Sequence, residues 1–364
     1  MRRARIRFGE PKRRAGCFLE RLPKSYAEPR ASARAESHSD RTLAVPDARY
    51  TKTGSAMASL AVEASRAPCR VRSPRRPLRV FTNLLRGGHR LQTALAVWLC
   101  CMTVGCAAPP SRPSHILSVA TLNMAHGRGL APTQLGLSRE RFVANVDAVA
   151  AVIKRQRPDV LAVQEADAPS TWSGSFDHVQ HLAAAIGYPH IHHGIHFHAD
   201  NGGLKLEYGT ALLARRVLGA PASFRFAARP LDTKGFVTAE IEFDGRPLLV
   251  ASAHLDARSA SIRNRQVEKL ISCLSSSGKP IVLMGDLNSR WSDESDAVRV
   301  LASRLGLYAY RPDQPELATF HANGPSKRID WILISPELEF VDCRVWPDQL
   351  SDHLAVAADL RWRD

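Results

Sequence analysis

Short apolar runs of four to seven residues recur from residue 115 to the C-terminus, and they constrain the fold most strongly. Runs of this length between turn residues are typical of buried strands. We expect strands at Leu117–Leu122, Val160–Val163, Thr210–Leu213, Val237–Phe243, Leu248–Ala253, Ile281–Met284, Ile329–Ile334 and Leu354–Leu360. This many strands with few helices predicts one α+β or α/β domain that contains at least one large sheet.

Two longer segments between these runs show a helical period instead. In residues 139–156, apolar side chains are spaced by four, three and four positions, and Pro158 follows the segment. A second such segment runs from Ser261 to Leu274. Each spacing places the apolar residues on one face of a helix, so we expect both helices to pack against a sheet.

Positive charge is concentrated in the first quarter of the chain. Residues 1–90 hold 22 basic residues (Lys or Arg) against 7 acidic residues (Asp or Glu). Residues 91–364 hold 28 basic and 28 acidic residues. The formal net charge of +15 therefore does not indicate a basic folded domain. Residues 1–79 show no sustained apolar period, which predicts a disordered Arg-rich segment. Three interpretations are open: a basic arm, a targeting segment, or sequence translated from upstream of the true start codon. We favour the last.

Residues 80–106 resemble a bacterial lipoprotein signal peptide. Arg86 and Arg90 precede the apolar run 94–105, and Cys106 follows it. As a helix this run spans about 18 Å, which is short of a bilayer core of about 30 Å. We expect Cys106 to be lipidated and to anchor the protein in the bacterial cell envelope, facing the periplasm or exterior. The alternatives for residues 80–106 are a signal peptide without lipidation and a buried apolar segment. The Pro-rich residues 107–114 predict a tether.

Polar residues able to carry chemistry stand at the ends of the expected strands. Taken singly, most of them are compatible with turns or with surface positions. Asp330 is the exception, because a carboxylate inside an apolar strand needs a partner. The candidate residues are Asn123, Glu165, His254, Asp286, Asn288, Asp330, Asp352 and His353. Carboxylates and amides suit Mg²⁺ or Mn²⁺, and histidines can transfer protons, so the set predicts metal-assisted hydrolysis of a phosphate ester.

Seven short segments in this order resemble the signature of the endonuclease/exonuclease/phosphatase superfamily, the DNase I-like hydrolases. The segments are Thr121–Asn123, Pro158–Glu165, Gly209–Leu213, Ala253–Asp256, Gly285–Asn288, Arg328–Leu333 and Ser351–His353. The resemblance implies that residues 115–364 form a four-layer αββα sandwich, with two packed, mainly antiparallel sheets flanked by helices. Thr210 departs from the pattern, because many members have Asn there.

The resemblance also implies the metal-binding residues. Glu165 matches the principal metal carboxylate, and Asn123 and Asp352 match residues that complete or support the shell of the ion. The implied cofactor is Mg²⁺, with Mn²⁺ as the alternative.

The remaining residues match catalytic roles in the family. Asp286 matches the residue that orients or deprotonates the attacking water, and Asn288 and His254 match groups that bind phosphoryl oxygens. Asp330 matches the carboxylate that fixes the tautomer of His353, which acts as a base or as a donor to the phosphate. The resemblance leaves open which residue takes the proton from the water.

Substrate and partners follow from charge and from local motifs. A neutral domain disfavours a tight grip on DNA, so nucleic acid is not the favoured partner. The segments Asn123–Gly129 and Trp172–His178 resemble members near the sphingomyelinase and lipid-remodelling branches. Five histidines in residues 190–198 are compatible with a phosphate-binding loop, an exposed surface or a second metal site.

We expect an exported monomer that hydrolyses a phosphodiester or phosphomonoester of a lipid headgroup or small molecule. A secreted nuclease is the alternative within the class. An inactive, membrane-tethered binding module on the same fold is the alternative from another class.

Overall fold

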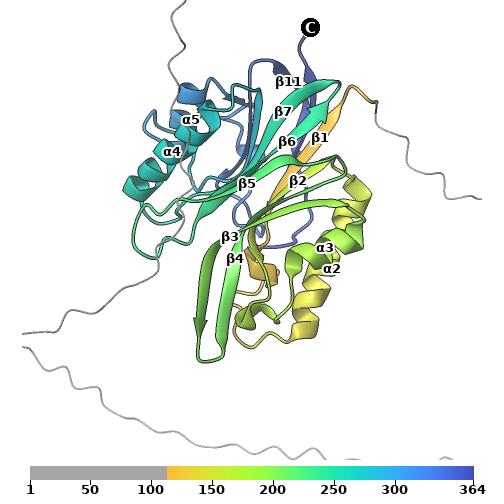
Figure 1. The fold of residues 1–364 in the computed structure, drawn as a ribbon, viewed down its shortest axis with the longest axis vertical. Helices are drawn as coiled ribbons and strands as arrows, with labels where there is room; N and C mark the ends of the chain where they lie inside the picture. The colour runs from red at the N-terminus through yellow and green to blue at the C-terminus, as the bar shows by residue number, and fades with distance from the viewer. Residues whose placement is uncertain (1–112) are drawn as a thin grey trace, which may run out of the picture. The chain divides into compact units, whose positions relative to one another are not determined.

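The computed structural model describes residues 113–364 and contains two six-stranded sheets (Figure 1). The expectations for the Arg-rich segment, the signal peptide, Cys106 and most of the tether lie outside the described residues. The first sheet contains, in spatial order, β11 (Leu338–Val345), β12 (Val356–Trp362), β1 (Leu117–Asn123), β2 (Val160–Asp167), β4 (Leu204–Ala214) and β3 (His190–Asn201).

The second sheet repeats the plan of the first. Its order is β5 (Gly219–Arg225), β6 (Gly235–Phe243), β7 (Arg246–His254), β8 (Ile281–Asp286), β10 (Asp330–Ile334) and β9 (Tyr308–Ala309). In both sheets neighbouring strands are antiparallel, except for the parallel pairs β1–β2 and β7–β8. Each parallel pair lies inside its sheet, where nearly all residues of its two strands are buried.

Helices cover the outer face of each sheet, as Figure 1 shows. The helices are α2 (Arg139–Gln156), α3 (His178–Ile186), α4 (Ala260–Ser275) and α5 (Ala297–Leu305), and the 3₁₀ turns are η1 (Ala125–Gly127), η2 (Thr171–Ser173) and η3 (Pro315–Leu317). Apolar side chains form three layers: between α2, α3 and the first sheet, between the sheets, and between the second sheet and α4 and α5. The four-layer αββα sandwich is confirmed.

Strand register determines where the candidate site residues lie. In the parallel pair β7–β8, His254 lies opposite Asp286 at the ends of both strands. In the antiparallel pair β8–β10, Asp330 lies opposite the same Asp286. In the first sheet, Asn123 ends β1 opposite Gln164, one residue before Glu165. Residues from distant parts of the sequence therefore meet at one end of the two sheets.

The predicted helix at residues 139–156 coincides with α2. Ser138 caps it by accepting a hydrogen bond from the backbone N–H of Arg141, and Arg157 follows it in the left-handed conformation. The strand predicted at Leu354–Leu360 lies two residues further along the chain, at Val356–Trp362 (β12). Four strands (β3, β5, β9, β11) and two nine-residue helices (α3, α5) were not predicted. Their polar or short sequences lack a long apolar period.

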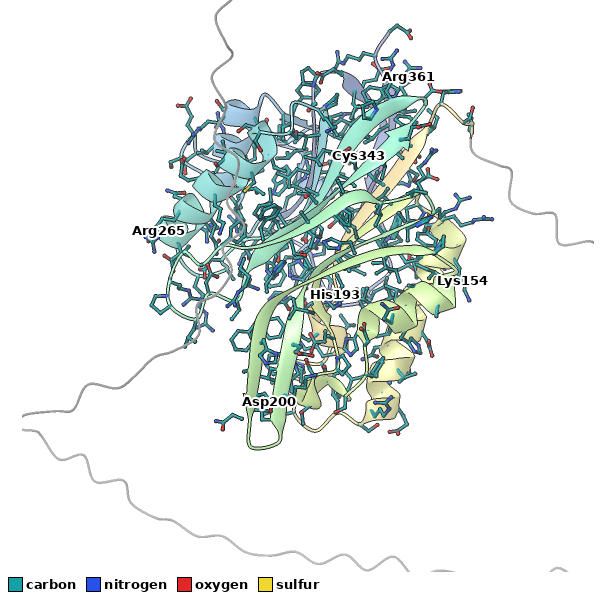
Figure 2. The ribbon with its side chains drawn as sticks, in the orientation of Figure 1. Lys154, His193, Asp200, Arg265, Cys343 and Arg361 are labelled. Carbon is teal, nitrogen blue, oxygen red and sulfur yellow. The ribbon has the colours of Figure 1, made fainter. Side chains whose placement is uncertain are left out.

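The histidine run at residues 190–198 is not a loop; it lies in the edge strand β3. Figure 2 labels His193 within this strand and Asp200 near the tip of the β3–β4 hairpin. His196 is only 1% exposed, and its Nε2 lies 2.8 Å from the Thr210 hydroxyl. Burial lowers the pKa of His196 to about 3, so this side chain is a neutral part of the interior.

The helices found within residues 113–364 include none with the length and apolar composition that a membrane-spanning helix requires.

Candidate active site

The candidate residues gather around one cleft of about 520 Å³. Seven of the eight line it directly, and the eighth, Asp330, is fully buried behind His353. The seven are Asn123, Glu165, His254, Asp286, Asn288, Asp352 and His353. Polar side chains from five separate segments of the chain thus converge on a space large enough for a small molecule.

Asp286 is the hydrogen-bonding centre of the cleft. Its Oδ2 accepts a 3.0 Å hydrogen bond from the Asn123 amide and lies 3.3 Å from His254 Nε2 and 3.8 Å from His353 Nε2. Its Oδ1 accepts the backbone N–H of Asn288 at 3.0 Å. Burial opposes ionisation, but the His353 and His254 imidazoles and these hydrogen bonds lower the pKa of Asp286 to about 2. Asp286 is therefore an ionised acceptor at neutral pH.

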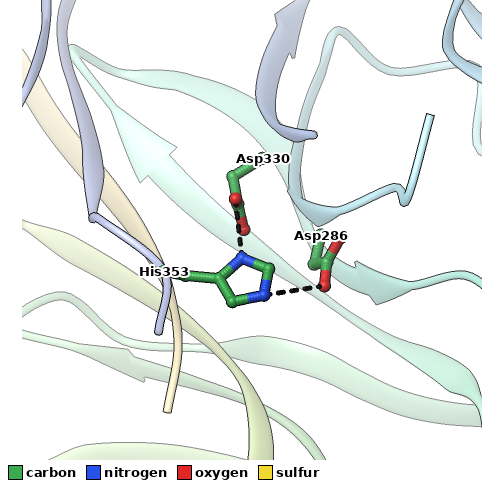
Figure 3. A group of neighbouring side chains, drawn as sticks. All are labelled: Asp286, Asp330 and His353. Carbon is green, nitrogen blue, oxygen red and sulfur yellow. Dashed lines mark hydrogen bonds and ion pairs between the residues drawn. The ribbon is translucent and has the colours of Figure 1, made fainter. Parts of the chain in front are cut away.

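Asp330 and His353 form a carboxylate–imidazole pair, which Figure 3 shows beside Asp286. His353 Nδ1 lies 2.9 Å from Asp330 Oδ2, which also accepts a 2.5 Å hydrogen bond from the Thr319 hydroxyl. Burial lowers the pKa of His353, but the Asp330 and Asp286 carboxylates outweigh it and raise the pKa to about 10. The pair fixes the ring so that Nε2 points toward Asp286, where it can exchange a proton in the cleft.

Glu165 lies at an irregularity in β2, between Gln164 and Ala166, with a positive φ of 47°. Residues other than glycine rarely adopt this left-handed backbone conformation, and it persists only where the surrounding structure enforces it. Glu165 Oε1 lies 3.2 Å from Lys234 Nζ, and Oε2 lies 3.4 Å from His126 Nε2. Burial raises the pKa of the Glu165 carboxyl, but these two groups outweigh it and hold the pKa well below its usual range.

Three oxygen-donor residues line the cleft and fit a divalent cation. Glu165, Asn123 and Asp352 offer the hard ligands that Mg²⁺ and Mn²⁺ prefer. The carboxylates of Glu165 and Asp352 are each 21% exposed, so both can reach an ion in the cleft. Asp352 also pairs with Arg128 at 2.6 Å, so protein cations balance both carboxylates. If Mg²⁺ binds here, these three residues would hold it.

A second group of side chains that could bind a metal ion also lies close together among the described residues. One atom each of Asp286, Asp330 and His353 lies within 4.8 Å of the others. However, the Asp330 and His353 donor atoms are already hydrogen-bonded to each other. We therefore interpret this group as a proton-transfer arrangement, so that the oxygen donors beside Glu165 are the candidate cation site.

Sequence reasoning missed Lys234, which lies in the loop before β6. Its ammonium lies 2.9 Å from His254 Nε2 as well as beside Glu165. The loop is braced by buried Asp232, which accepts hydrogen bonds from the backbone N–H of Lys234 and from the Gln266 side chain. A lysine before a strand resembles any surface lysine in sequence, so only the fold reveals this fixed positive charge.

Solved structures with similar folds support the architecture. An endonuclease/exonuclease/phosphatase from Beutenbergia cavernae has 22% identity and a TM-score of 0.57, covering 68% of this chain and 72% of its own. A Bacteroides vulgatus protein of the same description has 18% identity and a TM-score of 0.53, covering 68% and 99%. The human Nocturnin catalytic domain with bound sulfate has 20% identity and a TM-score of 0.52, covering 68% and 95%. At these identities the similarity shows the fold alone.

A search of curated proteins finds no match to this chain. The family model described as "Endonuclease/Exonuclease/phosphatase family", in contrast, matches residues 120–353. That stretch covers more than half of the chain and includes all eight candidate residues. The chain therefore belongs to the endonuclease/exonuclease/phosphatase family, whose members are hydrolases that act on phosphoester bonds.

Proposed function

We propose that this chain is an exported, Mg²⁺-dependent phosphoesterase that hydrolyses a phosphodiester or phosphomonoester of a lipid headgroup or small molecule. The convergence of the Glu165 carboxylate, ionised Asp286 and the Asp330–His353 pair on one cleft carries this proposal. These groups satisfy the three needs of phosphate ester hydrolysis: a cation site, an acceptor for the proton of water, and an acid–base group.

The chain's own residues suggest how the reaction proceeds. Water attacks phosphorus as the bond to the leaving oxygen breaks. Asp286, which is ionised, accepts the proton from the water, and His353, which is protonated, donates a proton to the leaving oxygen. His254 and Asn288 line the cleft and are positioned to stabilise negative charge on the phosphoryl oxygens, and Lys234 contacts His254 from behind the cleft. When bound, Mg²⁺ supplies Lewis-acid charge stabilisation at the phosphoryl group.

The charges around the cleft agree with a small anionic substrate. Arg263, Arg290 and Lys327 line it, but so do Asp293 and Asp296. This mixed rim suits one phosphate group better than a long polyanion, which requires several phosphate contacts. Nuclease activity is the second candidate, because four basic side chains, these three and Arg128, still line the same cleft.

A substrate panel tests the proposal. The purified chain is incubated with Mg²⁺ and sphingomyelin, phosphatidylinositol phosphates, bis-p-nitrophenyl phosphate or plasmid DNA, and each reaction is repeated with EDTA. We expect EDTA-sensitive release of product from a lipid or from the small diester, and its loss in Asp286→Asn. Faster cleavage of plasmid DNA would identify a nuclease, and no hydrolysis with retained lipid binding would identify a binding module.

Export and anchoring need a separate experiment in bacterial cells. Cys106→Ser should release the protein from the membrane fraction or leave it unprocessed, and deletion of residues 1–79 should change neither export nor activity. Cys100→Ser, in the same apolar run, is the matched control. An unchanged membrane fraction with normal cleavage of Cys106→Ser would contradict lipidation.

A further inference from the structure

A second carboxylate–imidazole pair, formed by Asp167 and His126, contacts the site and has no role in the reaction described above. His126 lies in η1 directly after β1, is 8% exposed and has a positive φ of 54°. Its Nδ1 lies 2.6 Å from Asp167 Oδ1, and its Nε2 lies 3.4 Å from Glu165 Oε2. One imidazole therefore links two carboxylates that lie two residues apart on β2.

Asp167 is held rigidly from its other side. Its carboxylate is fully buried, and Oδ2 accepts hydrogen bonds from the Trp172 indole at 2.7 Å and the Ser173 hydroxyl at 2.6 Å. The Trp172 and Tyr208 rings also pack against the His126 ring, with centroids 4.9 and 4.8 Å away. The imidazole therefore has little freedom to turn, so its Nε2 stays directed at Glu165.

His126 is not among the residues that line the cleft, so it does not face a substrate there. Its contact with the cleft runs through Glu165, whose other oxygen faces Lys234. Opposite oxygens of one carboxylate are thus held by two separate side chains. A carboxylate held in this way presents its oxygens in one orientation, which reduces the entropy lost when a cation binds.

We propose that His126, held by Asp167, is a positioning residue that orients Glu165 for divalent-cation binding. This inference rests on the proposed function, because it assigns the cation to Glu165. Partners that orient metal ligands typically change metal affinity by about 10- to 100-fold when they are removed. Loss of His126 should therefore weaken cation binding by a factor in that range and leave turnover at saturating cation within about threefold of wild type.

Direct cation binding tests the inference without relying on activity. Mn²⁺ affinity is measured by electron paramagnetic resonance for the wild-type chain, His126→Ala, His126→Gln and Glu165→Gln. The Mg²⁺ dependence of bis-p-nitrophenyl phosphate hydrolysis is measured in parallel. We expect His126→Ala to weaken Mn²⁺ binding by about 10- to 100-fold. His126→Gln should recover part of this loss, because its amide can donate to Glu165.

His178→Ala is the matched control. His178 is also a buried histidine, its Nε2 contacts the Ser173 carbonyl oxygen, and within residues 113–364 no hydrogen bond or ion pair joins it to Glu165. Thermal unfolding of both alanine variants reveals any general damage, and if His126→Ala does not fold, His126→Gln must bind Mn²⁺ more weakly than wild type. Equal weakening in His178→Ala and His126→Ala, or wild-type affinity in the folded His126 variants, would overturn the inference. Wild-type Mn²⁺ affinity in Glu165→Gln would instead overturn the cation site of the proposed function.

Discussion

Two buried carboxylate–imidazole pairs serve this cleft, and their local geometry is similar. His353 Nδ1 lies 2.9 Å from Asp330, and His126 Nδ1 lies 2.6 Å from Asp167. In both pairs the far ring nitrogen faces a second carboxylate. His353 Nε2 lies 3.8 Å from Asp286 Oδ2, and His126 Nε2 lies 3.4 Å from Glu165 Oε2.

The pairs differ in what surrounds them. His353 lines the cleft, whereas His126 is enclosed by two aromatic rings and reaches the cleft through Glu165. In one pair the Asp330 Oδ1 atom is buried without a hydrogen-bond partner, whereas in the other Asp167 Oδ2 accepts two hydrogen bonds. A pair suited to proton transfer therefore has access to the cleft, whereas a pair suited to holding a metal ligand is enclosed and has a carboxylate saturated with hydrogen bonds.

Removing His353 should produce the largest effect and tests the difference between the two pairs most directly. We expect His353→Ala to lower turnover of bis-p-nitrophenyl phosphate by about 10²-fold or more at saturating Mg²⁺, because a positioned acid–base group is lost. Mn²⁺ affinity should stay within about threefold of wild type. In the double variant with Asp286→Asn, the loss should be smaller than the product of the single losses, because both groups act at one phosphoryl centre. A fully multiplicative loss would contradict a shared centre.

Matched substitutions of the two aspartates sharpen the comparison. Asp330→Asn should lower turnover by about 10- to 100-fold, because the amide does not stabilise the required form of the imidazole. Asp167→Asn should instead weaken Mn²⁺ binding by about tenfold and leave turnover at saturating Mg²⁺ nearly unchanged. Steady-state kinetics and Mn²⁺ titration of both variants decide this, and identical profiles would show that the pairs share one role.

The pH dependence of stability should separate His353 from a surface histidine in the metal-free protein. The pKa of His353 in the folded state is about 10, which is above its ordinary value. The charged imidazole therefore stabilises the fold fully below about pH 6.5, and this contribution is lost as the pH rises toward 10. Urea unfolding with EDTA should show the stability gap between wild type and His353→Asn shrinking from pH 6.5 to 9.5. A gap that is constant or grows would contradict the charged pair.

Thr319→Val should have the smallest effect on the Asp330–His353 pair. It removes the hydroxyl that donates to Asp330 but leaves the imidazole in place. The free energy of unfolding should fall by about 1 to 3 kcal/mol, as expected when a buried hydrogen-bond acceptor loses a donor. Turnover should fall less than tenfold. A turnover loss as large as that of Asp330→Asn would show that Thr319 acts in the reaction itself.

Much of the fold could be predicted because apolar runs are local signals. The segment 139–156 contains its own period and its own N-cap at Ser138, so the helix bounds were correct. Strand β3 could not be predicted in this way, because five of its twelve residues are histidines and the segment lacks a regular apolar pattern. His196 is buried only because strands from both sheets pack around it.

For the site, the sequence by itself determined the kinds of chemistry, because carboxylates, amides and histidines stand at strand ends whatever their neighbours are. The tertiary structure decided which of them meet. The register of β8 and β10 places Asp330 opposite Asp286, although 43 positions separate them. Lys234 and His126 join Glu165 through a braced loop and a 3₁₀ turn. Such contacts depend on long-range pairing and loop geometry, which leave no local pattern in a sequence.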